Sequence, residues 1–393
     1  MSSTSPTAPP AASRTPEPSI TEPSPPGRQT LAPLTAEWIA ACGARFGAFA
    51  GGLSAPPLVA SHDDADGLSS AALLARAWAL HAGARPEIKL VGRGRNAWDA
   101  AFAAELARRA PSSLVICDLG VAGTRPLPGT PLAVIDHHVP TGTPADATVV
   151  SGYGVEPTPS TSMLAHWCAR GLGAVDDLDW LAVIGLVGDY GDKAPFAEIA
   201  AAKKRYGAGK LREAVSLVNA PRRAASGDAA PALELLLKAR DPGDVVGGAH
   251  LETARCQAMR EEVKAAVAEG RRAPPRFGTR YGRGVAIIRL DSPCQIHPLV
   301  AQSWVGRLRG KDGAGVIVFA ANFGFHEGAV SFAGRAGGEA DIIDLLTRHR
   351  PEGADPTRYG NGHRRASGGT LSPAAWNAFV DDLGFGPEMR AAT

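Results

Sequence analysis

The chain has 393 residues, of which 45% are hydrophobic and 20% charged, and its formal net charge is +2 at pH 7. This length exceeds what one hydrophobic core usually fills, so it predicts two domains of ordinary size. The composition is that of a globular protein, and the absence of any apolar stretch near ~20 residues excludes a membrane-spanning segment. The near-neutral charge neither favours nor excludes a nucleic-acid partner.

The five cysteines are scattered along the chain and form no C-x-x-C pair. This spacing excludes a thiolate zinc module of the usual kind and fits a reducing compartment. The N-terminus has no basic patch followed by an apolar run, which argues against a secretory signal. We therefore expect a cytoplasmic protein.

Strands and helices are predicted to alternate after an N-terminal tail. Residues 1–35 are rich in Pro, Ser, Thr and Ala, which predicts a disordered tail, and a helix is expected at 36–49. The next expected elements are strands at 58–60, 88–91, 114–117 and 132–135 and helices at 69–82, 97–110, 160–170 and 178–187. This order predicts a parallel sheet covered by helices, which continue to residue 269.

A second, smaller α/β domain is predicted after a linker. The linker is expected at 271–283, between a first domain at 36–270 and a second at 284–393. The second domain is expected to contain strands at 285–290, 316–320 and 329–333 and helices at 298–309, 340–348 and 373–383. A glycine-rich loop, GNGHRRASGG at 360–369, is expected before the last helix.

Polar side chains follow three strands of the predicted sheet. They are His62, Asp63, Asp64 and Asp66 after the first strand, Asp118 after the next, and Asp136, His137 and His138 within AVIDHHV. Because the carboxyl ends of parallel strands meet at one edge of a sheet, we expect these groups to converge. Converging carboxylates repel one another unless a cation lies between them. Carboxylate and imidazole without thiolate suit Mn²⁺, with Mg²⁺, iron, Co²⁺ or Zn²⁺ as substitutes.

Other interpretations of these residues stay open at this point. AVIDHHV, at 133–139, is also compatible with an N-cap Asp beside two surface histidines, and residues 66–67 with a phosphate-binding turn. An EF-hand is excluded, because its twelfth position would be Leu73 instead of Glu. Asp189, in GLVGD, is either a further ligand or a solvated residue at a helix end, and Asp192 competes with it for a ligand role.

Four of these segments resemble, in order and spacing, the motifs of the DHH phosphoesterase family. They are SHDDADGLSSA, the Asp of VICDLG, VIDHHVP and GLVGD. GNGHRRASGG is similar to the Gly-Gly-Gly-His signature of the DHHA1 domain that accompanies many members. The similarity runs from residue 58 to residue 383. It implies a parallel-sheet DHH domain with helical cover, followed by a smaller α/β DHHA1-type domain.

The resemblance also implies a site with two manganese ions, for which Mg²⁺ or Co²⁺ are substitutes. It places His62 and Asp64 on one ion. The second ion would be held by Asp66, His137 and Asp189, and Asp118 would bridge the two ions. The resemblance further implies catalytic roles for two residues: Asp136 would orient the site and His138 would face the scissile phosphate.

In the second domain, the resemblance implies a substrate-phosphate site. His363 and the backbone of the glycine-rich loop, including Gly362, would bind the phosphate. Further candidate contacts are Arg335, Arg364 and Arg365. The sequence departs from the family at Asn361, which replaces the middle glycine, and at 331–333, where Ser-Phe-Ala lacks the arginine of a Ser-x-Arg element.

The form of the first motif favours one substrate class. His-x-Asp-Ala-Asp-Gly is closer to the RecJ-like exonucleases than to the nanoRNase and pAp-phosphatase branch. We therefore expect an exonuclease that releases mononucleotides from single-stranded DNA, RNA or short oligonucleotides. The chain ends soon after the DHHA1-like segment and shows no series of aromatic stacking residues, so a phosphatase or phosphodiesterase acting on pAp or a cyclic dinucleotide is the alternative. A non-catalytic nucleic-acid-binding scaffold is less favoured, because it would not require this His and Asp set.

Overall fold

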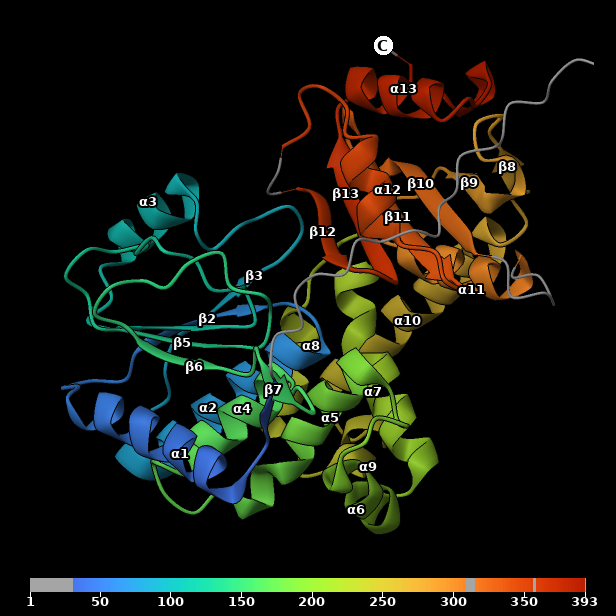
Figure 1. Ribbon diagram of the computed structural model, residues 1–393. Coiled ribbons are helices and arrows are strands. Elements are labelled where there is room, and N and C mark those ends of the chain that lie inside the picture. The colour runs from blue at the N-terminus through green and yellow to red at the C-terminus, as the bar shows by residue number, and fades with distance from the viewer. Residues whose placement is uncertain (1–30, 309–314, 356–357, 393) are drawn as a thin grey trace, which may run out of the picture. The chain divides into compact units, whose positions relative to one another are not determined.

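The computed structural model describes residues 31–308, 315–355 and 358–392. Residues 1–30 of the expected tail lie outside the described residues, whereas β1 (Ala32–Pro33) pairs in parallel with β7 (Val155–Glu156). The structure divides into two compact units, 26–266 and 267–393, which we call the N-terminal and C-terminal units (Figure 1). The stretch 271–283, expected to be a linker, contains strand β8 (Arg276–Phe277).

The N-terminal unit is built on a five-stranded parallel sheet with the strand order β3-β2-β4-β5-β6. The strands are β2 (Leu58–His62), β3 (Ile88–Val91), β4 (Leu114–Cys117), β5 (Leu132–Asp136) and β6 (Thr148–Ser151). Both faces of the sheet are covered, so the central strands β2, β4 and β5 are apolar up to their carboxyl ends, where Ser61, His62 and Asp136 follow the apolar residues. The predicted α/β class is confirmed; strand β6, at the sheet edge, was not predicted.

Helices cover both faces of this sheet (Figure 1). On one face, Phe102 and Leu106 of α3 (Ala100–Arg109) pack against Leu114 and Ile116. The apolar side chains of the other face, such as Val115, share a core with a second set of helices. These are α1 (Ala36–Gly51), α2 (Ala65–Ala82), α4 (Thr161–Ala169) and α5 (Asp179–Tyr190).

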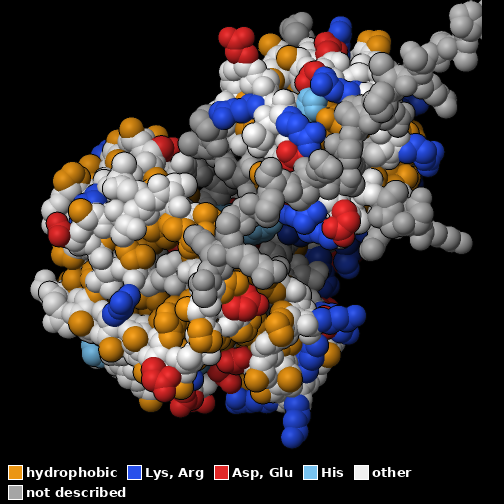
Figure 2. Space-filling model, in the orientation of Figure 1, with side chains coloured by type: hydrophobic (Ala, Val, Ile, Leu, Met, Phe, Trp, Pro, Cys, Tyr) orange, Lys and Arg blue, Asp and Glu red, His pale blue; other side chains and the backbone are white. Residues whose placement is uncertain are grey.

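Five further helices complete the N-terminal unit and lead out of it. They are α6 (Ala197–Tyr206), α7 (Ala208–Arg223), α8 (Ala230–Lys238), α9 (Pro242–Val246) and α10 (Leu251–Gly270). Over α6 and α7, Lys and Arg side chains lie among Asp and Glu side chains (Figure 2), and Lys203 and Arg212 both pair with Asp192. In the part of the chain that is described, no helix is both long and apolar enough to cross a membrane.

Helix α2 begins earlier than the sequence indicated. We expected it at 69–82, but its first residue is Ala65 because Asp64 caps it. Oδ1 of Asp64 accepts hydrogen bonds from the backbone N–H groups of Asp66 and Gly67, each at 3.1 Å. An Asp at this position satisfies N–H groups that have no partner within the helix. The cap places Asp66 in the first helical turn, next to the end of β2.

The C-terminal unit contains a six-stranded sheet with the strand order β12-β13-β11-β10-β9-β8. After β8, its strands are β9 (Val285–Leu290), β10 (Val316–His326), β11 (Ala329–Gly337), β12 (Tyr359–His363) and β13 (Ala366–Leu371). Its helices are α11 (His297–Leu308), α12 (Ile342–Arg348) and α13 (Pro373–Asp382). The core between this sheet and α13 includes stacked rings of Phe332 and Phe379, whose centroids are 5.9 Å apart.

The glycine-rich segment 360–369 is a β-hairpin, and the prediction of a loop there was wrong. Strands β12 and β13 pair antiparallel, and β13 pairs with β11. The glycines permit close approach of the backbones: a Cβ atom on Gly368 would lie 2.3 Å from the carbonyl oxygen of Phe332. At Gly362, φ is +135° and a Cβ atom would lie 2.4 Å from the carbonyl oxygen of Ala366. The composition that suggested a flexible loop therefore serves a closely packed sheet.

Candidate metal centre

The polar side chains converge at the carboxyl edge of the N-terminal sheet, as the sequence predicted. His62 is the last residue of β2, Asp118 follows β4, and Asp136 ends β5 just before His137 and His138. Strands β2, β4 and β5 are neighbours in the sheet, so their ends lie side by side. This edge is where open α/β sheets bind ligands.

Among the described residues, three overlapping groups of three side chains have the donor atoms and spacing to hold a metal ion, and one of them, Asp118, His137 and His138, shares a residue with each of the other two. The first of those two is His62, Asp64 and Asp118, and the second is Asp66, His137 and Asp189. Within each group the candidate donor atoms lie within 4.8 Å of one another. The first and second groups are the two sets that the resemblance implied, with Asp118 in the first of them; their roles as ligands stay predictions.

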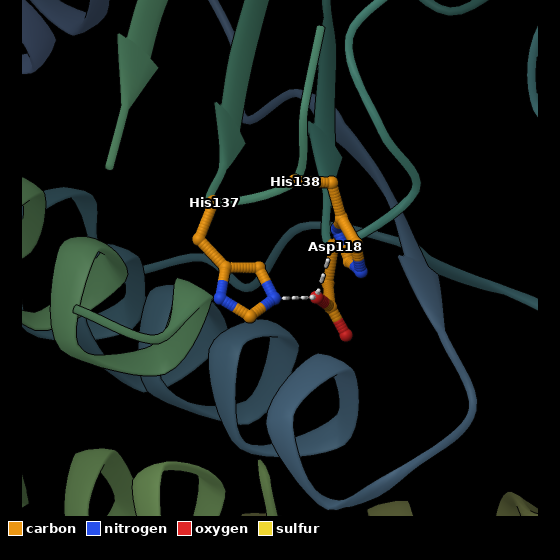
Figure 3. A group of neighbouring side chains, drawn as sticks. All are labelled: Asp118, His137 and His138. Atoms are coloured by element: carbon orange, nitrogen blue, oxygen red, sulfur yellow. Dashed lines mark ion pairs between the residues drawn. The ribbon is translucent and has the colours of Figure 1, made fainter. Parts of the chain in front are cut away.

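Asp118 lies between the two groups. Its Oδ2 is 3.5 Å from Nδ1 of His62, and its Oδ1 is 3.7 Å from Nε2 of His137. Figure 3 shows the imidazoles of His137 and His138 both directed at one oxygen of this carboxylate, Oδ1. The backbone of Asp118 has φ +61°, and Oδ1 accepts a hydrogen bond from the Thr161 hydroxyl at 3.1 Å. One oxygen of Asp118 therefore faces each group, which is the arrangement that a bridging carboxylate needs.

Asp66 is held at the N-terminus of α4. Its side chain is fully buried, and its two oxygens accept hydrogen bonds from the backbone N–H groups of Thr161 at 2.7 Å and Ser162 at 2.9 Å. A carboxylate is stabilised at such a helix end by the unpaired N–H groups and by the helix dipole. Gly185 of α5 packs so closely that a Cβ atom there would lie 2.5 Å from Oδ1 of Asp66.

Within the described part of the chain, the carboxylates of the two ligand groups have few positively charged groups near them, and their pKa values reflect this. Burial and the nearby Asp64 and Asp66 carboxylates raise the pKa of Asp118 well above its usual range. Burial and Asp66 likewise raise the pKa of Asp189. Burial also disfavours charge on Asp64, but His62 and Arg222, whose Nη2 is 3.8 Å away, hold its pKa well below its usual range. Closely spaced carboxylate and imidazole donors, with Asp66 and Asp118 buried, fit divalent cations.

The two adjacent histidines have different electrostatic environments. Burial lowers the pKa of His137, which favours the neutral imidazole that a metal ion requires. Burial also opposes charge on His138, but the hydrogen bond from its Nδ1 to Asp136, at 3.2 Å, raises its pKa to about 9. The His138 side chain is 49% exposed. It therefore exposes its imidazole to solvent beside the ligand groups.

Asp136 lies behind the ligand groups instead of within them. It is fully buried, and its Oδ1 accepts a hydrogen bond from the backbone N–H of His138 at 2.7 Å. Its Oδ2 accepts one from the backbone N–H of Gly120 at 2.8 Å. These bonds fix the loops that follow β4 and β5 and orient His138. The orienting role that the resemblance implied is compatible with this geometry and stays a prediction.

Sequence reasoning missed several side chains of the site. Thr161 and Ser162, at the start of α4, contact Asp118 and Asp66, and Tyr190 lies 2.8 Å from Nδ1 of His137. Nothing in the local sequence of these residues signals such contacts. Asp192, which the sequence left as a competitor of Asp189, turns away to Arg212 at 3.0 Å.

The predicted phosphate contacts of the C-terminal unit lie on neighbouring strands. His363 of β12 is exposed and pairs with Ala366 of β13, which in turn pairs with Arg335 of β11. Arg335 is four residues after Ser331, so both side chains leave the same face of β11. Two further arginines of the hairpin turn bond locally: Arg364 to Asp341 at 3.6 Å and Arg365 to the carbonyl of Gly338.

Gly67 gives a direct test of how the site is built. A Cβ atom at this position would lie 2.3 Å from the carbonyl oxygen of His62 and 2.8 Å from its Cβ. We expect Gly67→Ala to push His62 out of its group, to weaken Mn²⁺ binding and to lower the free energy of unfolding by about 1–3 kcal/mol. Calorimetric Mn²⁺ titration and urea unfolding measure both effects. Gly51→Ala is the matched control. A Cβ atom at that helical position would have nothing within 4 Å, so Mn²⁺ affinity and stability should equal those of the wild type. If Gly67→Ala also left both unchanged, the close packing at Gly67 would be contradicted.

Solved structures of similar fold include three whose descriptions name RecJ or a DHH domain. RecJ from Thermus thermophilus in complex with Mn²⁺ is 18% identical, with a TM-score of 0.64 over 90% of this chain and 55% of that one. An exonuclease RecJ bound to manganese is 19% identical, with a TM-score of 0.59 over 91% and 97%. The DHH domain of a member of the s1p family of ribosomal proteins is 16% identical, with a TM-score of 0.59 over 89% and 92%.

These comparisons establish the fold of the chain. It is the RecJ-like DHH/DHHA1 fold that the motifs indicated, and that prediction is confirmed. The chain spans about half the length of the T. thermophilus RecJ chain. No protein-family model matches the sequence, and no curated protein matches it.

Proposed function

We propose that this protein is a metal-dependent phosphodiester hydrolase that releases mononucleotides from single-stranded DNA or RNA or from short oligonucleotides. The observation that carries the proposal is the pair of ligand groups that face opposite oxygens of Asp118 at one edge of the sheet. Two of the structures with this fold are described as RecJ bound to manganese, and another as RecJ in complex with Mg²⁺. They support Mn²⁺ as the first metal to test, with Mg²⁺ and Co²⁺ as substitutes.

In this proposal the residues of the two groups are the metal ligands. His62 and Asp64 would hold one ion, Asp66, His137 and Asp189 would hold the other, and Asp118 would contribute to both. When bound, such a pair of ions activates a water molecule and neutralises charge on the attacking and leaving oxygens.

The remaining roles belong to side chains around the ligands. The imidazole of His138 is exposed and is suited to bind a non-bridging phosphate oxygen, while Asp136 keeps it oriented. In the C-terminal unit we assign His363, Gly362, Arg335 and Arg364 to phosphate groups of the substrate. Two observations support this assignment: His363 is exposed, and it is aligned across the sheet with Arg335, since both residues pair with Ala366.

The test is a hydrolysis assay with a panel of substrates. End-labelled DNA and RNA strands of several lengths, pAp and cyclic dinucleotides are each incubated with Mn²⁺, with Mg²⁺, with Co²⁺ and with EDTA. We expect mononucleotides to accumulate from the strands with Mn²⁺ and not with EDTA. Asp118→Asn serves as the inactive variant, so that any contaminating nuclease is detected.

The other outcomes separate the remaining possibilities. Phosphate release from pAp, or a linear dinucleotide from a cyclic one, with the strands left intact would replace the exonuclease by a small-nucleotide phosphatase or phosphodiesterase. Binding of single strands without any hydrolysis in Mn²⁺, Mg²⁺ or Co²⁺ would instead support a non-catalytic scaffold and overturn the proposed activity.

A further inference from the structure

Tyr190 contacts the metal centre from behind one of its candidate ligands. It is the last residue of α5, directly after Asp189, and its hydroxyl lies 2.8 Å from Nδ1 of His137. The other ring nitrogen of His137, Nε2, faces Asp189 at 3.4 Å and Asp118 at 3.7 Å. The imidazole therefore has carboxylates at one nitrogen and a neutral hydroxyl at the other.

The tyrosine ring is held in place by its surroundings. It stacks on Phe196, with an interplanar angle of 20° and a centroid distance of 6.4 Å, and Phe196 is only 8% exposed. Gly191 ends the helix directly after Tyr190 with φ +79°, a conformation that suits glycine. Asp192, two residues after Tyr190, forms ion pairs with Lys203 and Arg212 and so anchors the segment that follows α5. Tyr190 is 40% exposed, so the stacking on Phe196 and the turn at Gly191 direct the hydroxyl at His137.

The position of the proton on His137 decides whether it can bind a metal. A neutral imidazole has one N–H and one lone pair, and the lone pair is the metal ligand. If Nε2 binds the ion, Nδ1 carries the proton and needs an acceptor. Metal-binding histidines usually find that acceptor in a carboxylate, a backbone carbonyl or a water molecule; here the nearby group is the Tyr190 oxygen.

A tyrosine differs from a carboxylate in this position in two ways. A hydroxyl both donates and accepts, so it satisfies Nδ1 whether or not that nitrogen carries the proton. It also adds no negative charge to a site where Asp66, Asp118 and Asp189 already lie together. The contact can therefore form in the metal-free protein with either nitrogen of His137 protonated, but it favours the Nδ1–H form, which leaves Nε2 free for the ion.

We propose that Tyr190 is a positioning residue, whose hydroxyl oxygen accepts the Nδ1 proton of His137 and so aims the Nε2 lone pair at the ion held with Asp66 and Asp189. This inference rests on the function proposed above. Tyr190 acts through His137 and takes no part in binding the ion itself. Removing the hydroxyl therefore weakens one of the two ion sites and leaves the other unchanged.

Calorimetric titration of the metal-free full-length protein with Mn²⁺ tests this selectivity. For Tyr190→Phe, which keeps the ring on Phe196, we expect one class of Mn²⁺ sites to weaken about 10- to 100-fold and the other to keep its wild-type affinity. The thermal unfolding midpoint of the metal-free variant should equal that of the wild type. Tyr206→Phe, on a tyrosine whose ring packs beside Arg205 in α6, is the matched control and should change neither class.

A spectroscopic measurement examines the hydrogen bond itself. Zn²⁺ is diamagnetic, so histidine side-chain ¹H–¹⁵N spectra can be recorded on the Zn²⁺-loaded protein, with His137→Gln used for assignment. We expect a slowly exchanging Nδ1–H signal from His137 in the wild type. In Tyr190→Phe that signal should exchange with water and broaden, because its acceptor is gone.

Each contrary result has a distinct meaning. A wild-type protein that binds no Mn²⁺ would overturn the proposed function and this inference together. A wild type with two classes of sites and a Tyr190→Phe variant with unchanged affinities would overturn the inference alone. Equal weakening of both classes, or a lowered unfolding midpoint, would mean that Tyr190 merely supports the fold.

Discussion

Asp118→Asn is expected to abolish hydrolysis while leaving the metal-free protein at least as stable as the wild type. The Asp118 side chain is only 2% exposed, and burial with the neighbouring Asp64 and Asp66 carboxylates raises its pKa well above the usual range. An amide removes a charge that the metal-free fold accommodates poorly. The backbone also favours the change, because φ is +61° and Asn adopts that region more readily than most residues.

The loss of activity has a separate cause. Asp118 is the carboxylate that faces both ligand groups, so its replacement weakens both proposed ion sites at once. We expect a fall in rate of at least about 10²-fold, as is typical when a charge-stabilising group is removed from an active site. The stabilisation that Mn²⁺ gives the wild type should disappear as well, since a ligand stabilises only the state that binds it.

Thermal unfolding with EDTA and with Mn²⁺, together with the hydrolysis assay, measures both effects. With EDTA, the midpoint of Asp118→Asn should equal or exceed that of the wild type by a few degrees. Asp146→Asn is the matched control: Asp146 also has a positive φ, +53°, but is exposed and belongs to none of the candidate ligand groups. A markedly lower unfolding midpoint for Asp118→Asn in EDTA would contradict the prediction that the charge of Asp118 destabilises the metal-free fold.

The sequence predicted those parts of the site that depend on local patterns. Short apolar runs ending in Asp or His predicted strands β2, β4 and β5, and parallel pairing then brought their ends together. The order and spacing of the motifs predicted the DHH/DHHA1 fold, although pairwise identity to solved structures is only 16–19%. The first prediction rests on residues that are close to one another in the chain, and the second on the order of several such short segments.

What the sequence did not predict depends on contacts across long stretches of chain. The N–H groups that hold Asp66 come from Thr161 and Ser162, 95 and 96 positions away, and no local pattern reports such a pair. The hydroxyl beside His137 belongs to Tyr190, 53 positions away. The glycines at 360–369 have the composition of a loop, and only the neighbouring strand β11 explains why they form a hairpin.

Asp66→Asn is expected to destabilise the metal-free protein, whereas the same replacement at Asp118 is not. Its two oxygens accept backbone N–H groups at 2.7 and 2.9 Å, and the residue is fully buried at the N-terminus of α4. An asparagine would keep one acceptor and turn its NH₂ group toward the other N–H donor. Hydrogen bonds to a charged group contribute about 1.5–3 kcal/mol, so we expect Asp66→Asn to lower the free energy of unfolding by about that amount even without metal.

In Asp66→Asn, close packing around residue 66 would hold the side-chain NH₂ group against the backbone N–H donor that it faces. Gly185 leaves no room beside Asp66, since a Cβ atom there would already lie 2.5 Å from Oδ1 and 2.2 Å from the Ser162 hydroxyl oxygen. No group can therefore enter from the Gly185 side to pair with the misplaced NH₂ group. Urea unfolding in EDTA measures the effect, with Asp118→Asn and Asp146→Asn as variants of identical chemistry. If all three variants unfold at the same urea concentration as the wild type, Asp66 serves the metal alone. If only Asp66→Asn unfolds at a lower urea concentration, the Asp66 carboxylate also joins α2 to α4. One residue then supports both the fold and the ion site.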